Sequence, residues 1–150
     1  MSQIHSKASA VIHARPETIY GVLSDYRVGH PAILPKPYFT DLIIERGGQG
    51  AGTLARVYMN VMGVRRSYRM SVTEPEPGHL LKETDSDAGV VTTFTVTPLD
   101  GGEQSQVTIA TDAKASPGIQ GFFEKLISPS ITRRIYRKEL QLLTAYVQAK

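Results

Sequence analysis

The sequence predicts a single α+β domain in which a curved antiparallel sheet of about seven strands packs against a long C-terminal helix. Three observations support this fold class. The chain has 150 residues, of which 41% are hydrophobic and 21% charged, as in one globular domain covering 1–150. Hydrophobic residues recur with a helical period near both ends of the chain and with a period of two between them. Short turns rich in Gly, Pro and Asp divide the middle part, and such short connections join antiparallel neighbours.

The N-terminal part of the chain predicts one strand and two short helices. The strand covers Lys7–Ala14, and a helix begins near Pro16, because proline is well tolerated at the first helical position. Four residues at helical spacing form the apolar stripe of this helix: Ile19, Val22, Leu23 and Tyr26. Residues 29–37 contain one glycine and three prolines, which leave room for only a short second helix.

Six further strands are expected between Tyr38 and about Ala115. The breaks between them lie at 47–52, 62–63, 75–78, 85–89 and 100–102. The first break is rich in glycine, but a strand pattern follows it where a phosphate-binding loop requires a helix. We therefore interpret 47–52 as a flexible hairpin connection.

Two hairpins can be given a register from their side-chain patterns. If Met62 and Gly63 form a two-residue turn, Val61 lies opposite Val64, and one face of the pair is apolar except for Arg66. That face also carries Ala55, Val57, Met59, Tyr68 and Met70.

The second hairpin follows from a four-residue loop at 100–103. Its apolar face pairs Val96 with Val107 and Phe94 with Ile109, and its polar exceptions are the facing residues Thr92 and Thr111.

The last helix is expected to open at Ser116-Pro117, to run nearly to Lys150, and to kink at Pro129. Its apolar arc is wider than that of an ordinary surface helix. The arc consists of Ile131, Ile135, Tyr136, Leu140, Leu142, Leu143, Tyr146 and Val147. Thr132 and Glu139 lie within this arc. Because a buried charge needs a partner, Glu139 is the best internal partner for Arg66.

Composition and motifs exclude several functional classes. The chain has no Cys, and its four His residues are dispersed, so we predict no metal site and no cofactor. No combination of a nucleophile and a base is found, so no catalytic residue is assigned. The basic residues occur in isolated pairs without a nucleic-acid-binding motif. No apolar run is long enough for a transmembrane segment or a signal peptide, so a cytoplasmic location is expected.

Several short motifs together resemble a known superfamily. They are residues 11–20 (VIHARPETIY), residues 23–26 (LSDY), Pro31 with Pro35, residues 50–53 (GAGT) and residues 136–140 (YRKEL). Over about residues 7–148 the chain resembles the START / Bet v 1-like (SRPBCC) superfamily, and within it the bacterial polyketide cyclase/dehydrase and lipid-transport group. The resemblance implies a helix-grip fold, with the sheet wrapped around the C-terminal helix and an apolar cavity between them. Many relatives have a Trp where Ile33 and Leu34 stand here, so the cavity mouth is expected to differ.

The leading functional prediction is the binding or transport of a hydrophobic small molecule, such as a lipid, an isoprenoid or a polyketide, by a monomer or homodimer. One alternative is a polyketide cyclase or dehydratase, in which Arg66 stabilises an enolate and Glu139 or a tyrosine transfers protons. Another alternative is a protein-interaction module. The predicted ligand-binding residues are Val57, Met59, Arg66, Tyr68, Thr92, Phe94, Ile109, Thr111, Ile135 and Glu139.

Overall fold

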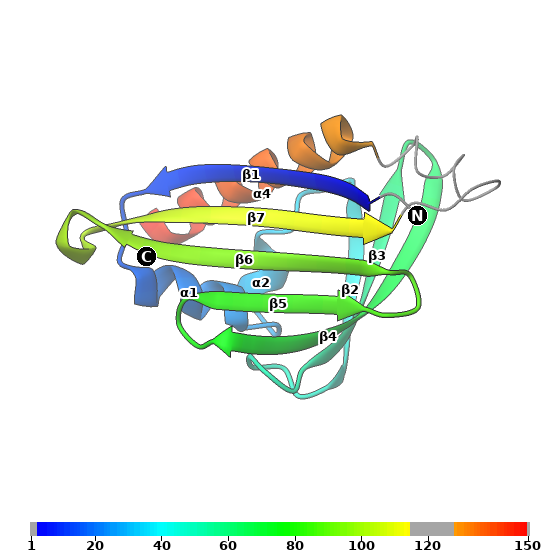
Figure 1. Ribbon diagram of the computed structural model, residues 1–150, viewed down its shortest axis with the longest axis horizontal. Helices are drawn as coiled ribbons and strands as arrows, with labels where there is room; N and C mark the ends of the chain where they lie inside the picture. The colour runs from blue at the N-terminus through cyan, green and yellow to red at the C-terminus, as the bar shows by residue number, and fades with distance from the viewer. Residues whose placement is uncertain (1–2, 115–127, 150) are drawn as a thin grey trace.

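The computed structural model describes residues 3–114 and 128–149, and Figure 1 shows how their elements are arranged. In chain order the elements are β1 (Gln3–Ile12), α1 (Pro16–Ser24), α2 (Gly29–Ala32), β2 (Phe39–Arg46), β3 (Leu54–Val61), β4 (Val64–Glu76), β5 (Leu80–Asp85), β6 (Val90–Leu99), the short 3-10 helix η1 (Asp100–Gly102), β7 (Gln104–Lys114) and α4 (Pro129–Gln148).

Within the described residues, seven strands form one sheet in the order β1-β7-β6-β5-β4-β3-β2, and every neighbouring pair is antiparallel. Only the pairing of β1 with β7 joins strands that are distant in the chain. Helix α4 lies behind the sheet in Figure 1 and contacts β1. The predicted helix-grip architecture is confirmed.

The two hairpin registers predicted from sequence are also confirmed. Met62 and Gly63 both have positive φ, 53° and 84°, as in the mirror-image turns that match the twist of a hairpin. The predicted pairs are present: Val61–Val64, Met59–Arg66, Val57–Tyr68, Phe94–Ile109, Thr92–Thr111 and Val96–Val107.

The first strand is displaced from its predicted bounds. It begins at Gln3 and ends at Ile12, because β7 offers a partner along this whole length, from Lys114 opposite Gln3 to Ser105 opposite Ile12. Pairing with a distant strand determined these ends, and the local sequence pattern carries no information about that partner.

The expected kink at Pro129 is wrong. Helix α4 begins at this residue, where its missing N–H needs no partner, and Ser128 is the N-cap. The Ser128 hydroxyl accepts a hydrogen bond from the Ile131 N–H at 3.3 Å. The predicted helix start at Ser116-Pro117 lies outside the described residues.

The apolar arc of α4 faces the interior with one exception. Leu142 lies at the edge of the arc and is 38% exposed, so its predicted place on the buried face is wrong. The buried residues of the helix are Thr132, Ile135, Glu139, Leu140, Leu143 and Val147. Thr132 and Glu139 are therefore buried polar residues, as the helical period predicts.

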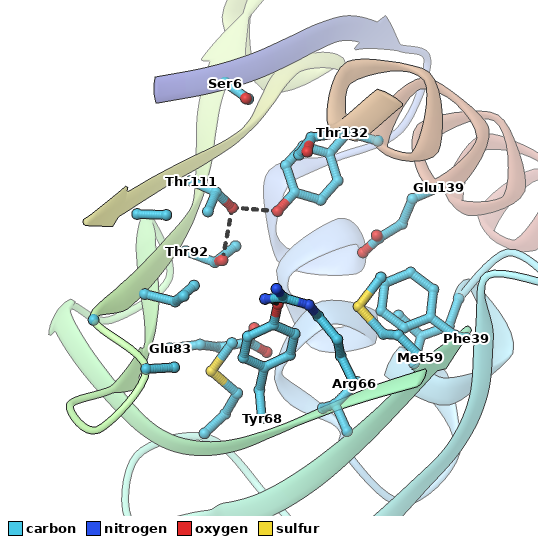
Figure 2. Close-up of a pocket in the computed structure, with 18 of the residues that line it drawn as sticks. Ser6, Phe39, Met59, Arg66, Tyr68, Glu83, Thr92, Thr111, Thr132 and Glu139 are labelled. Atoms are coloured by element: carbon cyan, nitrogen blue, oxygen red, sulfur yellow. Dashed lines mark hydrogen bonds between the residues drawn. The ribbon is translucent and has the colours of Figure 1, made fainter. Parts of the chain in front are cut away.

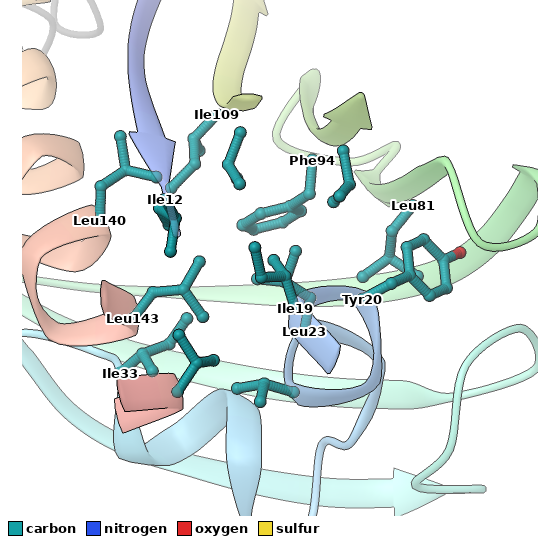
Figure 3. Close-up of a cluster of buried hydrophobic side chains, with 14 of the residues drawn as sticks. Ile12, Ile19, Tyr20, Leu23, Ile33, Leu81, Phe94, Ile109, Leu140 and Leu143 are labelled. Carbon is teal, nitrogen blue, oxygen red and sulfur yellow. The ribbon is translucent and has the colours of Figure 1, made fainter. Parts of the chain in front are cut away.

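The hydrophobic core fills only part of the interior. Figure 3 shows Ile19 and Leu23 of α1 packed against Leu143 of α4 and Leu81 of β5. The C-terminal half of α4 and the η1 end of the β6–β7 hairpin belong to this core. The N-terminal half of α4 and the other end of the same hairpin carry Thr132, Glu139, Thr92 and Thr111, and they line a cavity. The polar exceptions in the sequence thus mark where the core ends.

Residues 47–52 form the β2–β3 connection, as predicted, and they pack on the segment between α1 and α2. The Tyr26 N–H donates to the Gly48 carbonyl oxygen (2.9 Å), and the Gly50 N–H donates to that of Ser24 (2.8 Å). Gly48 has a φ of +136°, and the Arg27 side chain packs so closely that a Cβ would lie 2.6 Å from its Nε. The positive φ favours glycine there, and the hydrogen bond from the Tyr26 N–H holds the backbone of Tyr26 in place.

Candidate functional site

A cavity of about 680 Å³ lies between the sheet and the N-terminal half of α4. Figure 2 shows side chains from the strands and from α4 converging on it. Its apolar lining residues are Ile4, Leu34, Phe39, Leu42, Val57, Met59, Met70, Ala88, Gly89, Val90, Phe94 and Ala113. The lining residues that carry a polar side-chain group are Ser6, His30, Arg66, Tyr68, Glu83, Ser86, Asp87, Thr92, Thr111, Lys114, Thr132, Tyr136 and Glu139.

Most of the ligand-binding residues predicted from sequence line this cavity. They are Val57, Met59, Arg66, Tyr68, Thr92, Phe94, Thr111 and Glu139. The structure does not place Ile109 or Ile135 among the lining residues. Both are buried, at 0% and 2% exposure, and Ile109 belongs to the hydrophobic core.

Thr92 and Thr111 join a chain of hydroxyl groups along one wall. Thr92 Oγ1 and Thr111 Oγ1 are 2.7 Å apart across the β6–β7 pair, and Thr111 Oγ1 also hydrogen-bonds the Tyr136 hydroxyl from α4. Figure 2 shows both bonds as dashed lines. Burial raises the pKa of Tyr136, so its phenol remains neutral. This chain of hydrogen bonds ties the sheet to the helix and pairs the hydroxyl of buried Thr92 with those of half-buried Thr111 and Tyr136.

A second polar cluster, not predicted from sequence, consists of Tyr26, His30 and Glu83. The Tyr26 hydroxyl donates to Glu83 Oε2 at 2.6 Å. The ring of His30 stacks on that of Tyr26 with centroids 4.5 Å apart, and His30 Nε2 lies 3.7 Å from Glu83 Oε2. Glu83 and His30 are 6% and 2% exposed, so the cluster is almost fully removed from solvent.

The tautomer of His30 follows from its other nitrogen. Nδ1 lies 2.7 Å from the Leu23 carbonyl oxygen, which can only accept, so Nδ1 carries a proton. The other ring nitrogen, Nε2, faces Glu83 at 3.7 Å, which is too far for a hydrogen bond.

The short helix α2 that carries His30 is held by Asp25. The Asp25 carboxylate accepts hydrogen bonds from the backbone N–H groups of Arg27, Val28 and Gly29. Burial acts to raise the pKa of Asp25, but these backbone hydrogen bonds outweigh it and lower the pKa. The ionised Asp25 therefore holds the backbone where α2, the helix that carries His30, begins.

Glu139 is the one lining residue with an unsatisfied buried polar atom among the described residues. Its side chain is 2% exposed, and Oε2 has no hydrogen-bond partner. Burial, and to a lesser degree the negative charge of Glu83, raises the pKa of Glu139 well above its ordinary value of 4.5. Figure 2 shows its carboxyl group projecting from α4 into the space beside Arg66 and Met59.

The predicted pair of Arg66 with Glu139 is not formed. Arg66 does line the cavity, but its Nη1 donates to the Tyr68 hydroxyl at 3.3 Å. The register brings Arg66 to the apolar face of the sheet, yet its long side chain turns along the strand toward Tyr68. No ion pair or hydrogen bond joins it to Glu139 within the described part of the chain.

Residues 3–114 and 128–149 contain neither a metal-binding cluster nor a membrane-spanning helix. No group of three His, Asp or Glu side chains there could hold a metal ion. No helix in these residues is long and apolar enough to cross a membrane.

Comparisons with known proteins agree with this architecture. The chain matches the family described as polyketide cyclase / dehydrase and lipid transport over residues 3–148. No curated protein sequence matches it. Among solved structures it is similar to the KanY protein, with 30% identity, 99% of each chain covered and a TM-score of 0.84.

Two more distant structures share the fold. The Zhui aromatase/cyclase from a Streptomyces species has 16% identity and a TM-score of 0.76, with 98% of this chain and 94% of that chain covered. The Thalictrum flavum norcoclaurine synthase in complex with dopamine and hydroxybenzaldehyde has 17% identity and a TM-score of 0.69, with 99% and 88% covered.

Proposed function

The chain belongs to the polyketide cyclase / dehydrase and lipid transport family, and we propose that it binds and carries a largely apolar small molecule in the cavity between the sheet and α4. The observation that carries this proposal is the cavity itself. Its volume of about 680 Å³ lies within the range of roughly 300–1,000 Å³ that small-molecule sites occupy.

The chemistry of the wall favours a hydrophobic ligand with few polar groups. Phe39, Leu42, Val57, Met59 and Phe94 offer apolar surface, and burial of apolar ligand surface against it gains about 25 cal/mol per Å². Several polar groups of the wall already have protein partners: the hydroxyls of Thr92, Thr111 and Tyr136 bond to one another, and Glu83 accepts from Tyr26 behind the wall. Polar groups that already have a hydrogen-bond partner in the protein gain little by bonding to a polar atom of the ligand.

A matched pair of variants on β6 tests the cavity as the binding site. Val90 lines the cavity, whereas its neighbour Val91 lies on the other face of the strand, so Val90→Phe fills the cavity and Val91→Phe does not. The fluorescent probe anilinonaphthalene sulfonate is an aromatic anion whose rings bind in apolar sites. We expect Val90→Phe to weaken its binding strongly and Val91→Phe to leave its binding near the wild-type value. Equal binding by the two variants would place the ligand elsewhere.

Native mass spectrometry of the protein as purified from cells extends this test to a natural ligand. We expect a bound apolar molecule in the wild type and in Val91→Phe, and its absence in Val90→Phe. A wild-type protein that carries no molecule and binds no apolar probe would instead favour the protein-interaction module.

A second candidate function, a cyclase or dehydratase acting in the same cavity, is favoured by one specific observation. Glu83 and Glu139 are two buried carboxyl groups of the same wall with different surroundings, and such pairs often divide acid and base roles. Arg66 would stabilise an enolate in that reaction. Recovery of a chemically changed product, lost in Glu83→Gln, would favour the enzyme over the carrier.

A further inference from the structure

One atom of the cavity wall points to the chemistry of the ligand. The hydroxyls of Thr92, Thr111 and Tyr136 bond to one another, and Glu83 accepts from Tyr26. Glu139 Oε2 is buried in the same cavity with no partner among the described residues. A buried polar atom left unpaired costs about 1–3 kcal/mol, and a ligand that bonds to this group recovers part of that free energy.

The surroundings of Glu139 determine which hydrogen bond it can make. The titratable groups that share the cavity wall with it are His30, Arg66, Tyr68, Glu83, Asp87, Lys114 and Tyr136. No ion pair among the described residues includes Glu139, and the negative charge of Glu83 disfavours a second negative charge on Glu139. An isolated carboxylate in such a place takes up a proton rather than remain charged. Glu139 is therefore a carboxylic acid whose O–H can donate.

We propose that Glu139 is a specificity-determining hydrogen-bond donor, and that the cavity selects an apolar ligand with a carbonyl oxygen, such as a ketone or a quinone, over an amine on the same skeleton. This inference rests on the proposed function, because it assigns the ligand class of the same cavity. A carbonyl oxygen accepts the O–H bond without bringing a charge, whereas an ammonium group would require Glu139 to ionise.

Three probes of one skeleton separate the possibilities: tetralin, α-tetralone and aminotetralin, which are a hydrocarbon, a ketone and an amine. In wild type at neutral pH we expect α-tetralone to bind more tightly than aminotetralin. Loss of one neutral hydrogen bond of about 1 kcal/mol corresponds to about a fivefold change in Kd. Tetralin, which forms no hydrogen bond, measures the apolar part of binding alone.

Substitutions at Glu139 distinguish a neutral acid from an ionised one. Glu139→Gln keeps an N–H donor, so we expect it to retain α-tetralone binding; Glu139→Leu removes the donor, so it should weaken α-tetralone about fivefold and leave tetralin unchanged. Glu76→Gln, at an exposed position, is the matched control and should bind all three probes as wild type does. Tighter binding of the amine in wild type, lost in Glu139→Gln, would overturn the proposal.

The outcomes also separate this inference from the proposed function. If tetralin and α-tetralone both fail to bind wild type, the proposed function fails and the inference fails with it. If both bind equally and neither responds to Glu139→Leu, the cavity binds apolar molecules but Glu139 does not select them.

A readout without any ligand tests the protonation state directly. The infrared spectrum of wild type at neutral pH should contain a carboxylic acid carbonyl band that is missing from Glu139→Gln. Glu83 is present in both proteins, so the difference spectrum isolates Glu139. A difference spectrum with only carboxylate bands would overturn the proposal whether or not the Leu variant folds.

Discussion

Replacing Glu139 by Gln should change how the free energy of unfolding depends on pH. In the unfolded chain this carboxyl group titrates near its ordinary pKa of 4.5, whereas burial and the charge of Glu83 raise its pKa in the folded protein. Between the two values the unfolded chain has released the proton and the folded protein has kept it. The stability that protonated Glu139 contributes is therefore fully present below its pKa in the unfolded chain. It is lost as pH rises toward the pKa of Glu139 in the folded protein.

The magnitude follows from a difference of one bound proton. Within that interval the free energy of unfolding falls by about 1.4 kcal/mol per pH unit, so two units within it correspond to about 2.7 kcal/mol. That is a large part of the roughly 5–15 kcal/mol by which small domains are stable. Glu139→Gln has no proton to lose, so its stability relative to wild type should increase by up to this amount as pH rises.

Urea denaturation at a series of pH values from about 5.5 to about 7.5 measures this difference. Glu45→Gln is the control, because the hydrogen bond and charge of Arg69 lower the pKa of Glu45. The stability that ionised Glu45 contributes is present above the ordinary pKa of a glutamate and is lost only as pH falls through the lowered pKa. The stability difference between Glu45→Gln and wild type should therefore be constant over the same pH range. A flat difference for Glu139→Gln as well would show that Glu139 is ionised in the folded protein and would refute the reasoning.

Three further outcomes are expected. Leu143→Asp should unfold the domain because Leu143 is fully buried, whereas Gln141→Asp, at an exposed position of the same helix, should leave the thermal midpoint almost unchanged; similar midpoints would contradict the helical phase. A double-mutant cycle of Arg66→Met and Glu139→Gln should give a coupling energy near zero in chemical denaturation, since no ion pair joins the two; a coupling above about 1 kcal/mol would contradict the structure. Tyr26→Phe should destabilise the protein by about 1–3 kcal/mol in the same assay, because Glu83 Oε2 loses a buried donor, and an unchanged stability would mean that this bond contributes nothing.

Local sequence patterns are enough to predict the sheet side of the site. The turn at Met62-Gly63 and the period-two alternation around it allow only one register, because a shift of one residue would bury polar side chains instead of apolar ones. The same alternation places Arg66 and the Thr92–Thr111 pair on the inner face of the sheet. The helical period likewise places Glu139 on the buried side of α4.

The cluster of Tyr26, His30 and Glu83 could not be predicted in this way. Glu83 alternates with Leu81 and Asp85 on one face of β5, and the other face carries Leu80, Lys82 and Thr84, so neither face is apolar enough to be recognised as buried. His30 belongs to a segment rich in proline, where no period identifies an inner face. Only the docking of α2 against β5 brings them together.

The sequence by itself determined the order of the main elements, the two hairpin registers and the inner faces of β3, β4, β6 and β7, because these depend on residues close to one another in the chain. The tertiary structure decided three other things: that Pro129 begins α4, that Arg66 turns to Tyr68, and that Glu139 Oε2 has no partner among the described residues. The environment of Glu139 in particular depends on distances between side chains on different elements, which no local pattern contains. Periodicity shows which side of an element is inward, but the reach of a side chain across a cavity depends on how the elements pack.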